Sequence, residues 1–352
     1  MLKQFAKSVF DWLSPWQREA KPAQPRGRDA AITHVIILDG TMSSLRPGCE
    51  SNAGRALRLL SAIGAPVSCF YEAGLQWDDW RSSRDVFLGR GIDLQIRRAY
   101  GYLASRYRPG DKIMFLGYSR GAFAVRSLAG VIDCVGLLRA DCATERNVKT
   151  AYRHYQSGGS SAVAAAFTAA LCHDTVEIEM IGVWDTVKAL GLHLPLLWRW
   201  TALPSGFHSL VLGPSVKHGF HALALNETRK AFSPVLWRCE DRDDCRIEQV
   251  WFPGAHGDVG GQLAGFEEAR PLANIPFVWM LGKVESCGVP LPQGWRAAYP
   301  TDPAAPSVGA WRSWGKLFLM RRKRVPLQGV SERLHESVGQ REIALGHSVQ
   351  EA

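Results

Sequence analysis

The chain predicts an α/β fold, in which a mostly parallel sheet is covered by helices on both faces. Two observations along its 352 residues support this fold class. Short apolar, β-branched runs alternate with segments of helical periodicity, and a G-x-S-x-G sequence follows one of these runs at 117–121. Strands buried on both faces show such continuous apolar runs, because helices pack on each side of the sheet.

Five segments have the composition of buried strands, namely 34–38, 66–71, 112–116, 176–184 and 247–252. Helical patterns occur at 51–62, 93–107, 120–132, 145–170, 215–231 and 271–286. An insertion rich in leucine and tryptophan at 190–214 interrupts the alternation directly after the fourth strand. The sequence therefore predicts an apolar insertion near the end of that strand, where parallel sheets hold their functional residues.

The domain organisation follows from composition. Residues 1–30 predict an amphipathic helix and a linker rich in proline and basic residues, 31–345 one catalytic domain, and 346–352 a tail. The N-terminal helix is compatible with a membrane surface and equally with packing on the main domain. A basic run at 321–324 follows several aromatic residues and is a second candidate for contact with anionic head groups.

The balance of 46% hydrophobic and 21% charged residues excludes a mainly disordered or fibrous protein. The formal net charge of +9 favours an anionic partner, such as a phospholipid surface, a nucleic acid or an acidic protein. No apolar stretch reaches the length of a membrane-spanning helix, and no cleavable signal peptide is evident. We expect synthesis in the cytoplasm, with any export by another route.

The eight cysteines form no CxxC pair, and a chain of this size does not need disulfides to fold. We therefore expect mostly reduced thiols. Cys239 and Cys245 bracket an acidic stretch, for which a polar loop between strands is the preferred interpretation and a metal or disulfide role the alternative.

The G-x-S-x-G sequence lies between an apolar strand and a helical segment, the context that a nucleophile elbow requires. Gly117 and Gly121 allow a sharp turn that lifts the Ser119 hydroxyl above the edge of the sheet. The backbone N–H of Arg120, at the start of the helix, is then placed to stabilise an oxyanion. This pattern predicts an α/β-hydrolase-like fold with Ser119 as the nucleophile.

A serine nucleophile needs a base and a residue that orients the base, and in this fold class they follow in the order Ser, Asp or Glu, His. Asp185 ends an apolar strand, and His256 lies in a glycine-rich loop after the next one, so the two fit that order. Three histidines, each a weaker candidate for the base, are His218, His221 and His335. Asp258 is an alternative to Asp185, although a role in shaping the loop is preferred.

The second oxyanion donor usually comes from a loop after an early strand. Here Asp39-Gly40-Thr41 follows the first strand, so the N–H of Gly40 or Thr41 is the candidate. Asp39 at a strand end also fits a metal or phosphoryl site, but no second carboxylate cluster accompanies it. A structural role for Asp39 is therefore preferred.

Three motifs in this order resemble one bacterial family closely: Gly-Tyr-Ser-Arg-Gly-Ala-Phe at 117–123, Gly-Val-Trp-Asp-Thr-Val at 182–187, and Trp-Phe-Pro-Gly-Ala-His-Gly-Asp-Val-Gly-Gly at 251–261. The family is that of α/β-hydrolase domains that includes the phospholipase (lipase) effectors of type VI secretion. The resemblance touches most of residues 33–341. It implies the same triad, a phospholipid substrate, no cofactor, delivery by type VI secretion, and an immunity protein and a secretion-machinery component as partners.

The sequence thus predicts a serine esterase that cleaves acyl esters of membrane phospholipids through an acyl-enzyme intermediate, with peripheral membrane contact. An esterase on a small soluble ester is one alternative. The other is a non-catalytic basic module that binds membrane or nucleic acid. It agrees with the charge but leaves the ordered Ser, Asp and His unexplained, and no nucleic-acid-binding motif is present, so no nucleic-acid partner is expected.

Overall fold

A computed structural model of the chain describes residues 30–74, 90–187, 210–239, 245–312 and 319–346. The chain divides into two compact units, Met1–Ala31 and Ile32–Ala352, and the second contains all of the elements described below. Three sequence predictions lie wholly or mainly outside the described residues: the N-terminal helix and linker, most of the apolar insertion at 190–214, and the tail.

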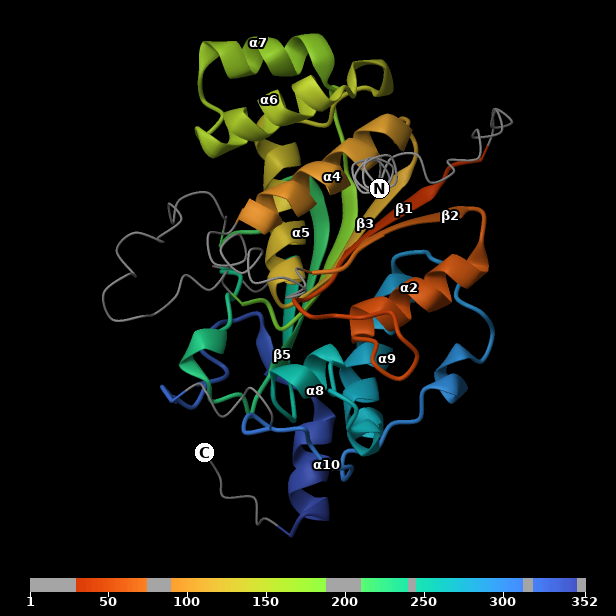
Figure 1. The fold of residues 1–352 in the computed structure, drawn as a ribbon, viewed down its shortest axis with the longest axis vertical. Helices are drawn as coiled ribbons and strands as arrows, with labels where there is room; N and C mark the ends of the chain where they lie inside the picture. The colour runs from red at the N-terminus through yellow and green to blue at the C-terminus, as the bar shows by residue number, and fades with distance from the viewer. Residues whose placement is uncertain (1–29, 75–89, 188–209, 240–244, 313–318, 347–352) are drawn as a thin grey trace, which may run out of the picture. The chain divides into compact units, whose positions relative to one another are not determined.

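The second unit is built on a seven-stranded sheet with the order β2-β1-β3-β4-β5-β6-β7, in which every neighbouring pair is parallel (Figure 1). The strands are β1 (Thr33–Leu38), β2 (Val67–Glu72), β3 (Lys112–Tyr118), β4 (Ile178–Trp184), β5 (Val216–Ala224), β6 (Ile247–Phe252) and β7 (Glu332–Leu334). The predicted fold class is confirmed, because parallel strands need helical crossovers that cover both faces of the sheet.

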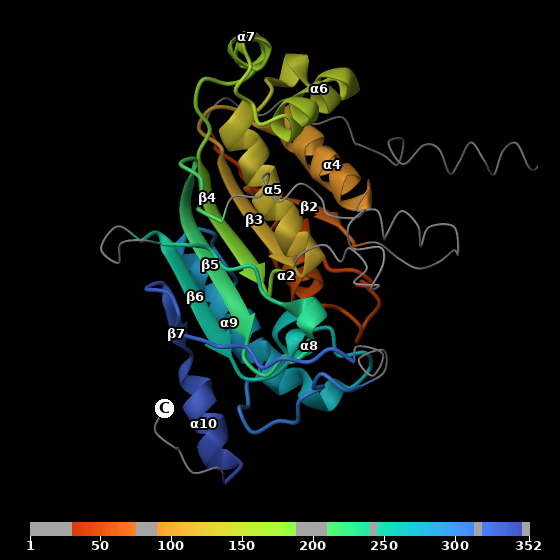
Figure 2. The ribbon, with the colours of Figure 1, turned by 90° about the vertical axis from the view of Figure 1, so that its left-hand side faces the viewer.

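The helices are α2 (Asn52–Ile63), α4 (Arg90–Arg106), α5 (Arg120–Val135), α6 (Glu145–Gln156), α7 (Ala162–Leu171), α8 (His256–Gly260), α9 (Arg270–Ser286) and α10 (Glu336–Ala344). Helices α4 and α5 cover one face of the sheet, with α6 outside them, and α2 and α9 cover the other (Figures 1 and 2). The sheet is therefore the middle layer of three.

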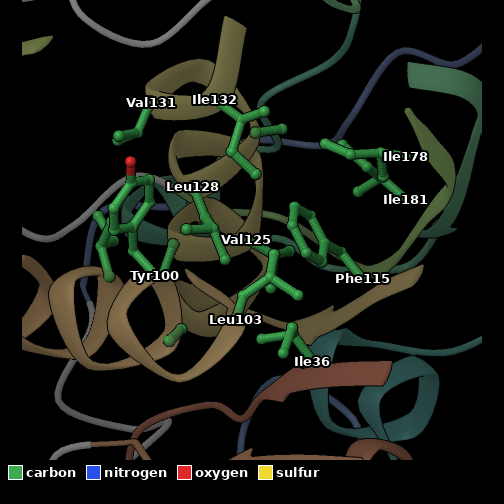
Figure 3. Close-up of a cluster of buried hydrophobic side chains, with 14 of the residues drawn as sticks. Ile36, Tyr100, Leu103, Phe115, Val125, Leu128, Val131, Ile132, Ile178 and Ile181 are labelled. Carbon is green, nitrogen blue, oxygen red and sulfur yellow. The ribbon is translucent and has the colours of Figure 1, made fainter. Parts of the chain in front are cut away.

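Strand β1 shows how one strand serves both layers. Ile36 and Leu38 belong to the core with α4 and α5, whereas Val35 and Ile37 belong to the core with α2 and α9. This alternation follows from the period of two in a strand. Figure 3 shows the first core, where Phe115 of β3 lies among side chains of α4 and α5. Each such large side chain contributes about 1.5–3 kcal/mol on burial.

The five predicted strands are all present, within a few residues of their predicted limits. The predicted helix at 145–170 is instead two helices, α6 and α7, separated by Gly158 and Gly159. Both glycines have positive φ, 85° and 68°, which a continuing helix does not allow. Strand β7 and helix α10 are additional elements that the sequence pattern did not indicate.

The predicted helix at 215–231 is wrong: residues Val216–Ala224 form β5, in the middle of the sheet. Two polar residues, His218 and His221, break the apolar run that marks a buried strand, and this hides the strand in the sequence. His218 is exposed near the start of β5, whereas His221 is fully buried. The fold tolerates His221 because both ring nitrogens are hydrogen-bonded.

The Nε2 atom of His221 accepts the Thr186 N–H at 3.1 Å, and its Nδ1 lies 3.3 Å from Oε1 of Gln249. These contacts require a neutral ring with the proton on Nδ1. Burial, with the charge of Arg126 acting in the same direction, lowers the pKa of His221 to about 3. His221 thus has a structural place in the sheet rather than the role of a catalytic base.

Cys239 and Cys245 form a disulfide across the acidic stretch, with a Cα–Cα distance of 6.0 Å. The disulfide alternative, and not the preferred plain polar loop, holds for this pair, whereas the other six cysteines are free, in agreement with mostly reduced thiols. The two Cα atoms lie within the usual distance range for a disulfide. The number of residues between the two cysteines does not by itself predict this distance. No helix within the described residues is long and apolar enough to cross a membrane.

The low pKa of His221 predicts an acid-sensitive fold. Between about pH 6.5 and pH 3 the unfolded chain binds a proton at this histidine that the folded chain does not. Stability is therefore expected to fall by about 2 kcal/mol between neutral pH and about pH 5 from this group. Urea unfolding at the two pH values measures the loss. His221→Gln should make the dependence shallower, whereas His218→Gln, on the same strand, should leave it unchanged. An identical pH dependence in both variants would contradict the assignment.

Candidate active site

The candidate site lies where β3, β4 and β6 end. Ser119 directly follows β3, Asp185 directly follows β4, and His256 begins α8, four residues after the end of β6. Because these strands are parallel, their carboxyl ends meet at one edge of the sheet, the edge next to α8 in Figure 2. The fold thus brings together three residues that are up to 137 positions apart in the chain.

Ser119 occupies a sharp turn between β3 and α5, with a φ of 57° that is uncommon for a residue with a side chain. The turn is tight enough to exclude any Cβ at its two glycines. A Cβ at Gly117 would lie 2.7 Å from Cα of Ala122, and one at Gly121 would lie 2.1 Å from the Leu38 carbonyl oxygen. The N–H of Arg120 is one of the first in α5 and has no acceptor within its own helix.

The three candidate triad side chains form a continuous hydrogen-bonded series. The Ser119 Oγ lies 2.9 Å from Nε2 of His256, and Nδ1 of the same ring lies 2.5 Å from Oδ2 of Asp185. All three residues are buried, with exposed fractions of 7%, 4% and 0% for Ser119, His256 and Asp185. This arrangement holds the histidine between a hydroxyl and a carboxylate, as general-base activation of a nucleophile requires.

Asp185 accepts four hydrogen bonds. Its Oδ1 receives the N–H of Ala224 at 3.0 Å and Nη1 of Arg324 at 2.6 Å, and its Oδ2 receives His256 and, at 3.0 Å, Nη2 of Arg324. Burial alone would raise the pKa of Asp185, but the charge of Arg324 and the hydrogen bond and charge of His256 outweigh it and lower the pKa. The carboxylate is therefore held ionised and in one orientation.

The imidazole of His256 lies between two aromatic rings. Tyr118 stacks on it with centroids 4.9 Å apart, and Phe232 packs at 4.8 Å with a tilt of 57°. The backbone N–H of His256 donates to Glu227, whose carboxylate in turn accepts a two-point contact from Arg229. Burial would raise the pKa of Glu227, but the contact with Arg229 outweighs it and lowers the pKa. His256 is thus fixed at its ring and at its backbone.

The loop after β1 lies directly beside Ser119, since a Cβ at Gly40 would be 3.2 Å from Cβ of Ser119. Asp39 organises this loop: it accepts hydrogen bonds from the Gly40 N–H and from the hydroxyls of Ser43, Ser51 and Tyr71. Burial raises the pKa of Asp39 in spite of these contacts. Because the Gly40 N–H is bound to Asp39 at 2.7 Å, Thr41 is the remaining candidate for the second oxyanion donor.

The alternatives considered for the triad lie elsewhere. Asp258 accepts hydrogen bonds from the Ala255 N–H, the Ser307 hydroxyl and the Val308 N–H, and so shapes the loop around α8. His335 caps α10, where its ring accepts the Ser337 N–H. Neither residue contributes to the hydrogen-bonded series of Ser119.

Sequence reasoning missed Arg324 as part of the site. The basic run at 321–324 is visible in the sequence, but the pattern indicates a surface run on lipid head groups. The structure instead buries the Arg324 side chain to 5% exposure, where it also donates to the carbonyls of Ala224 and Phe232. No local signal distinguishes this arginine from its neighbours, because its partners lie about 100 and more positions earlier.

The elbow geometry predicts that Gly121 tolerates no side chain. Gly121→Ala places a methyl group against the Leu38 carbonyl and is expected to cost about 3 kcal/mol or more of the free energy of unfolding. Gly339→Ala is the matched control, since a Cβ there meets nothing within 4 Å. Thermal unfolding of both variants tests this expectation, which fails if the two variants are equally stable.

The two-point contact of Arg324 predicts a large stability effect. Arg324→Met leaves the Asp185 carboxylate buried without its cation, so we expect a loss of about 3–5 kcal/mol near neutral pH. Because the folded-state pKa of Asp185 is lowered, this contribution is present above about pH 4 and should shrink as the pH falls further. Urea unfolding measures it, and Arg322→Met, at an exposed neighbour, is the control. Equal stability of the two variants would contradict the assignment.

Three known proteins and one protein family are similar to this chain. The yeast Saccharomyces cerevisiae has an uncharacterized protein, YEL023C, that is 27% identical over 230 residues, or 58% of this chain and 32% of the yeast protein. A crystal structure of an uncharacterized protein from Pseudomonas aeruginosa matches with 17% identity and a TM-score of 0.41, over 77% of this chain and 49% of that one. The chain thus spans a third to half the length of these relatives.

A third similar protein is the Tle1 effector in its structure bound to the VgrG spike of the type VI secretion system. It matches with 21% identity and a TM-score of 0.34, over 67% of this chain and 52% of that one. The family described as "T6SS, Phospholipase effector Tle1-like, catalytic domain" matches residues 33–283, which is most of the chain and includes Ser119, Asp185 and His256. The chain therefore belongs to the family of Tle1-like phospholipase effector catalytic domains of type VI secretion.

Proposed function

We propose that this protein is a serine phospholipase that hydrolyses acyl esters of membrane phospholipids through Ser119, His256 and Asp185. The observation that carries the proposal is the hydrogen-bonded series from the Ser119 hydroxyl through the His256 ring to Asp185. Family membership supports a lipid substrate. The site needs no metal or cofactor for this chemistry.

In the proposed mechanism, Nε2 of His256 accepts the proton of Ser119 as the hydroxyl attacks the acyl carbonyl carbon. The negative Asp185 stabilises the imidazolium that forms and keeps the second ring proton on Nδ1. The imidazolium then protonates the departing alcohol, which leaves an acyl-serine. Water, activated by the same histidine, attacks the acyl-serine and releases the fatty acid.

The tetrahedral oxyanion needs donors that are in place before it forms. The N–H of Arg120 is the first candidate, since it begins α5 at the positive end of the helix dipole. The N–H of Thr41 is the second, because the loop of Gly40 packs against Ser119 and Asp39 holds that loop in place.

The proposal extends to the biological role that family membership supports. We propose that the protein is an antibacterial effector, made in the cytoplasm and delivered to a target cell by type VI secretion. Its partners would then be a component of the secretion machinery and an immunity protein in the producing cell. Phospholipid is the proposed substrate, and no nucleic acid is expected.

The decisive experiment compares the purified protein with its Ser119→Ala variant. We expect a fluorophosphonate probe to label the wild type, and the wild type to release fatty acid from vesicles of phosphatidylglycerol and phosphatidylethanolamine. Both signals should be lost in the variant, with the rate falling by about 10³-fold or more. Thermal unfolding of both proteins shows whether Ser119→Ala retains the fold.

Each other outcome points to a different function. Labelling without fatty-acid release would keep the serine hydrolase but replace the substrate by a small soluble ester. No labelling, with vesicle binding retained in Ser119→Ala, would favour a non-catalytic binding module and would contradict the mechanism. Ser127→Ala is a matched control, since this buried serine of α5 donates to the Phe123 carbonyl of its own helix and lies outside the triad.

A further inference from the structure

The segment 319–327, which we call the surface strap, runs beside the candidate active site. Backbone hydrogen bonds join it to the segment after β5: the Lys230 N–H donates to the Met320 carbonyl, and the Arg322 N–H donates to the Thr228 carbonyl. Two inward arginines hold it further. Arg321 donates to the Thr228 hydroxyl and the Ala310 carbonyl, and Arg324 binds Asp185. The strap is therefore fixed to the protein by four points of contact.

Several other side chains of the strap are large, apolar and exposed. Their exposed fractions are high: Leu319 84%, Met320 58%, Val325 56% and Leu327 54%. Trp311, on whose ring the Arg321 guanidinium lies at 3.8 Å, is 60% exposed as well. Single exposed apolar residues are ordinary, but five within one short stretch of surface indicate a contact face.

The charged side chains of this face favour one kind of partner. Arg322 and Lys323 are exposed between the two apolar pairs of the strap, and the whole chain carries a net charge of +9. Basic side chains set among apolar and tryptophan side chains suit the interface of an anionic bilayer, where cations meet phosphates and apolar groups enter the acyl region. A water-soluble acidic partner would match the two cations but would leave the apolar side chains without a role.

We propose that the surface strap, with Trp311, is the face by which this protein docks on an anionic phospholipid bilayer. The inference rests on the proposed phospholipase function, since it supplies the route by which a bilayer lipid meets the site. Arg324 is in the same strap and bonds Asp185, so a docked bilayer lies next to the candidate triad. The basic run is thus divided: Arg321 and Arg324 hold the strap down, while Arg322 and Lys323 face the lipid.

The test measures vesicle binding in the full-length Ser119→Ala protein, so that no hydrolysis disturbs it. Two sets of substitutions are added, Leu319→Ser with Val325→Ser and Leu327→Ser, and Arg322→Gln with Lys323→Gln. We expect the apolar set to weaken binding to phosphatidylglycerol vesicles at least about tenfold. The charge set should weaken it about tenfold at low salt, with little effect on phosphatidylcholine vesicles.

Matched controls lie on α6 and α7, at the opposite end of the second unit from α8 and α10 (Figures 1 and 2). Val163→Ser removes an apolar side chain that is 70% exposed, and Arg146→Gln with Arg153→Gln removes two exposed cations. These controls should bind vesicles as the parent does. Unchanged binding in the strap variants, or an equal loss in the controls, overturns the proposal.

Failure of the strap and failure of the proposed function are separable. The same substitutions are also made in the protein that keeps Ser119, where the rate of hydrolysis of a water-soluble ester reports whether the site is intact. The rate of vesicle hydrolysis by each variant is then normalised to its rate on the soluble ester. Loss of vesicle binding in the strap variants supports docking even if the parent releases no fatty acid. If the strap variants still bind and hydrolyse vesicles normally, the proposed phospholipase function stands and the proposed docking role of the strap is wrong.

Discussion

The Asp185 carboxylate is a full charge with no exposed surface, and much of the site follows from how that charge is compensated. Moving an ion out of water costs several kcal/mol, so every oxygen lone pair needs a donor. The donors come from separate parts of the chain: Ala224 at the end of β5, His256 at the start of α8, and Arg324 in the surface strap. One buried ion therefore joins the sheet, the start of α8 and the surface strap.

Backbone strain accompanies this buried charge. Ser119 and Asp185 have φ values of 57° and 43°, and each such conformation costs of order 1–3 kcal/mol unless the surroundings enforce it. The enforcement comes from close packing: β3 and β4 are neighbouring central strands, and hydrophobic cores lie on both faces of the sheet. The site is thus held in a geometry that an isolated strand end would not keep.

The surface strap has inward side chains that contact the candidate site and outward side chains that are exposed to solvent. Its inward arginines reach the carboxylate of Asp185 and the segment after β5, whereas its outward side chains are apolar or basic and meet solvent. The same stretch of chain therefore carries the electrostatic support of the candidate triad and the proposed lipid contact. Under the proposed function, this short distance brings a bilayer lipid close to the candidate triad.

The sequence by itself determined the fold class, the elbow at 117–121, and the order of Ser119, Asp185 and His256. It could do so because these features are local: an apolar run followed by small residues, or by one polar residue where a strand ends. The closeness of the three side chains was an expectation that followed from parallel strands.

Only the tertiary structure decided the rest. His221 hid β5, because this buried histidine is tolerated only through its partners Thr186, just after β4, and Gln249 on β6. The N–H of Gly40, one of the two predicted oxyanion donors, is bound to Asp39, a contact that the sequence did not indicate. Arg324 looked like its neighbours, because what separates a buried arginine from an exposed one is a partner far away in the sequence.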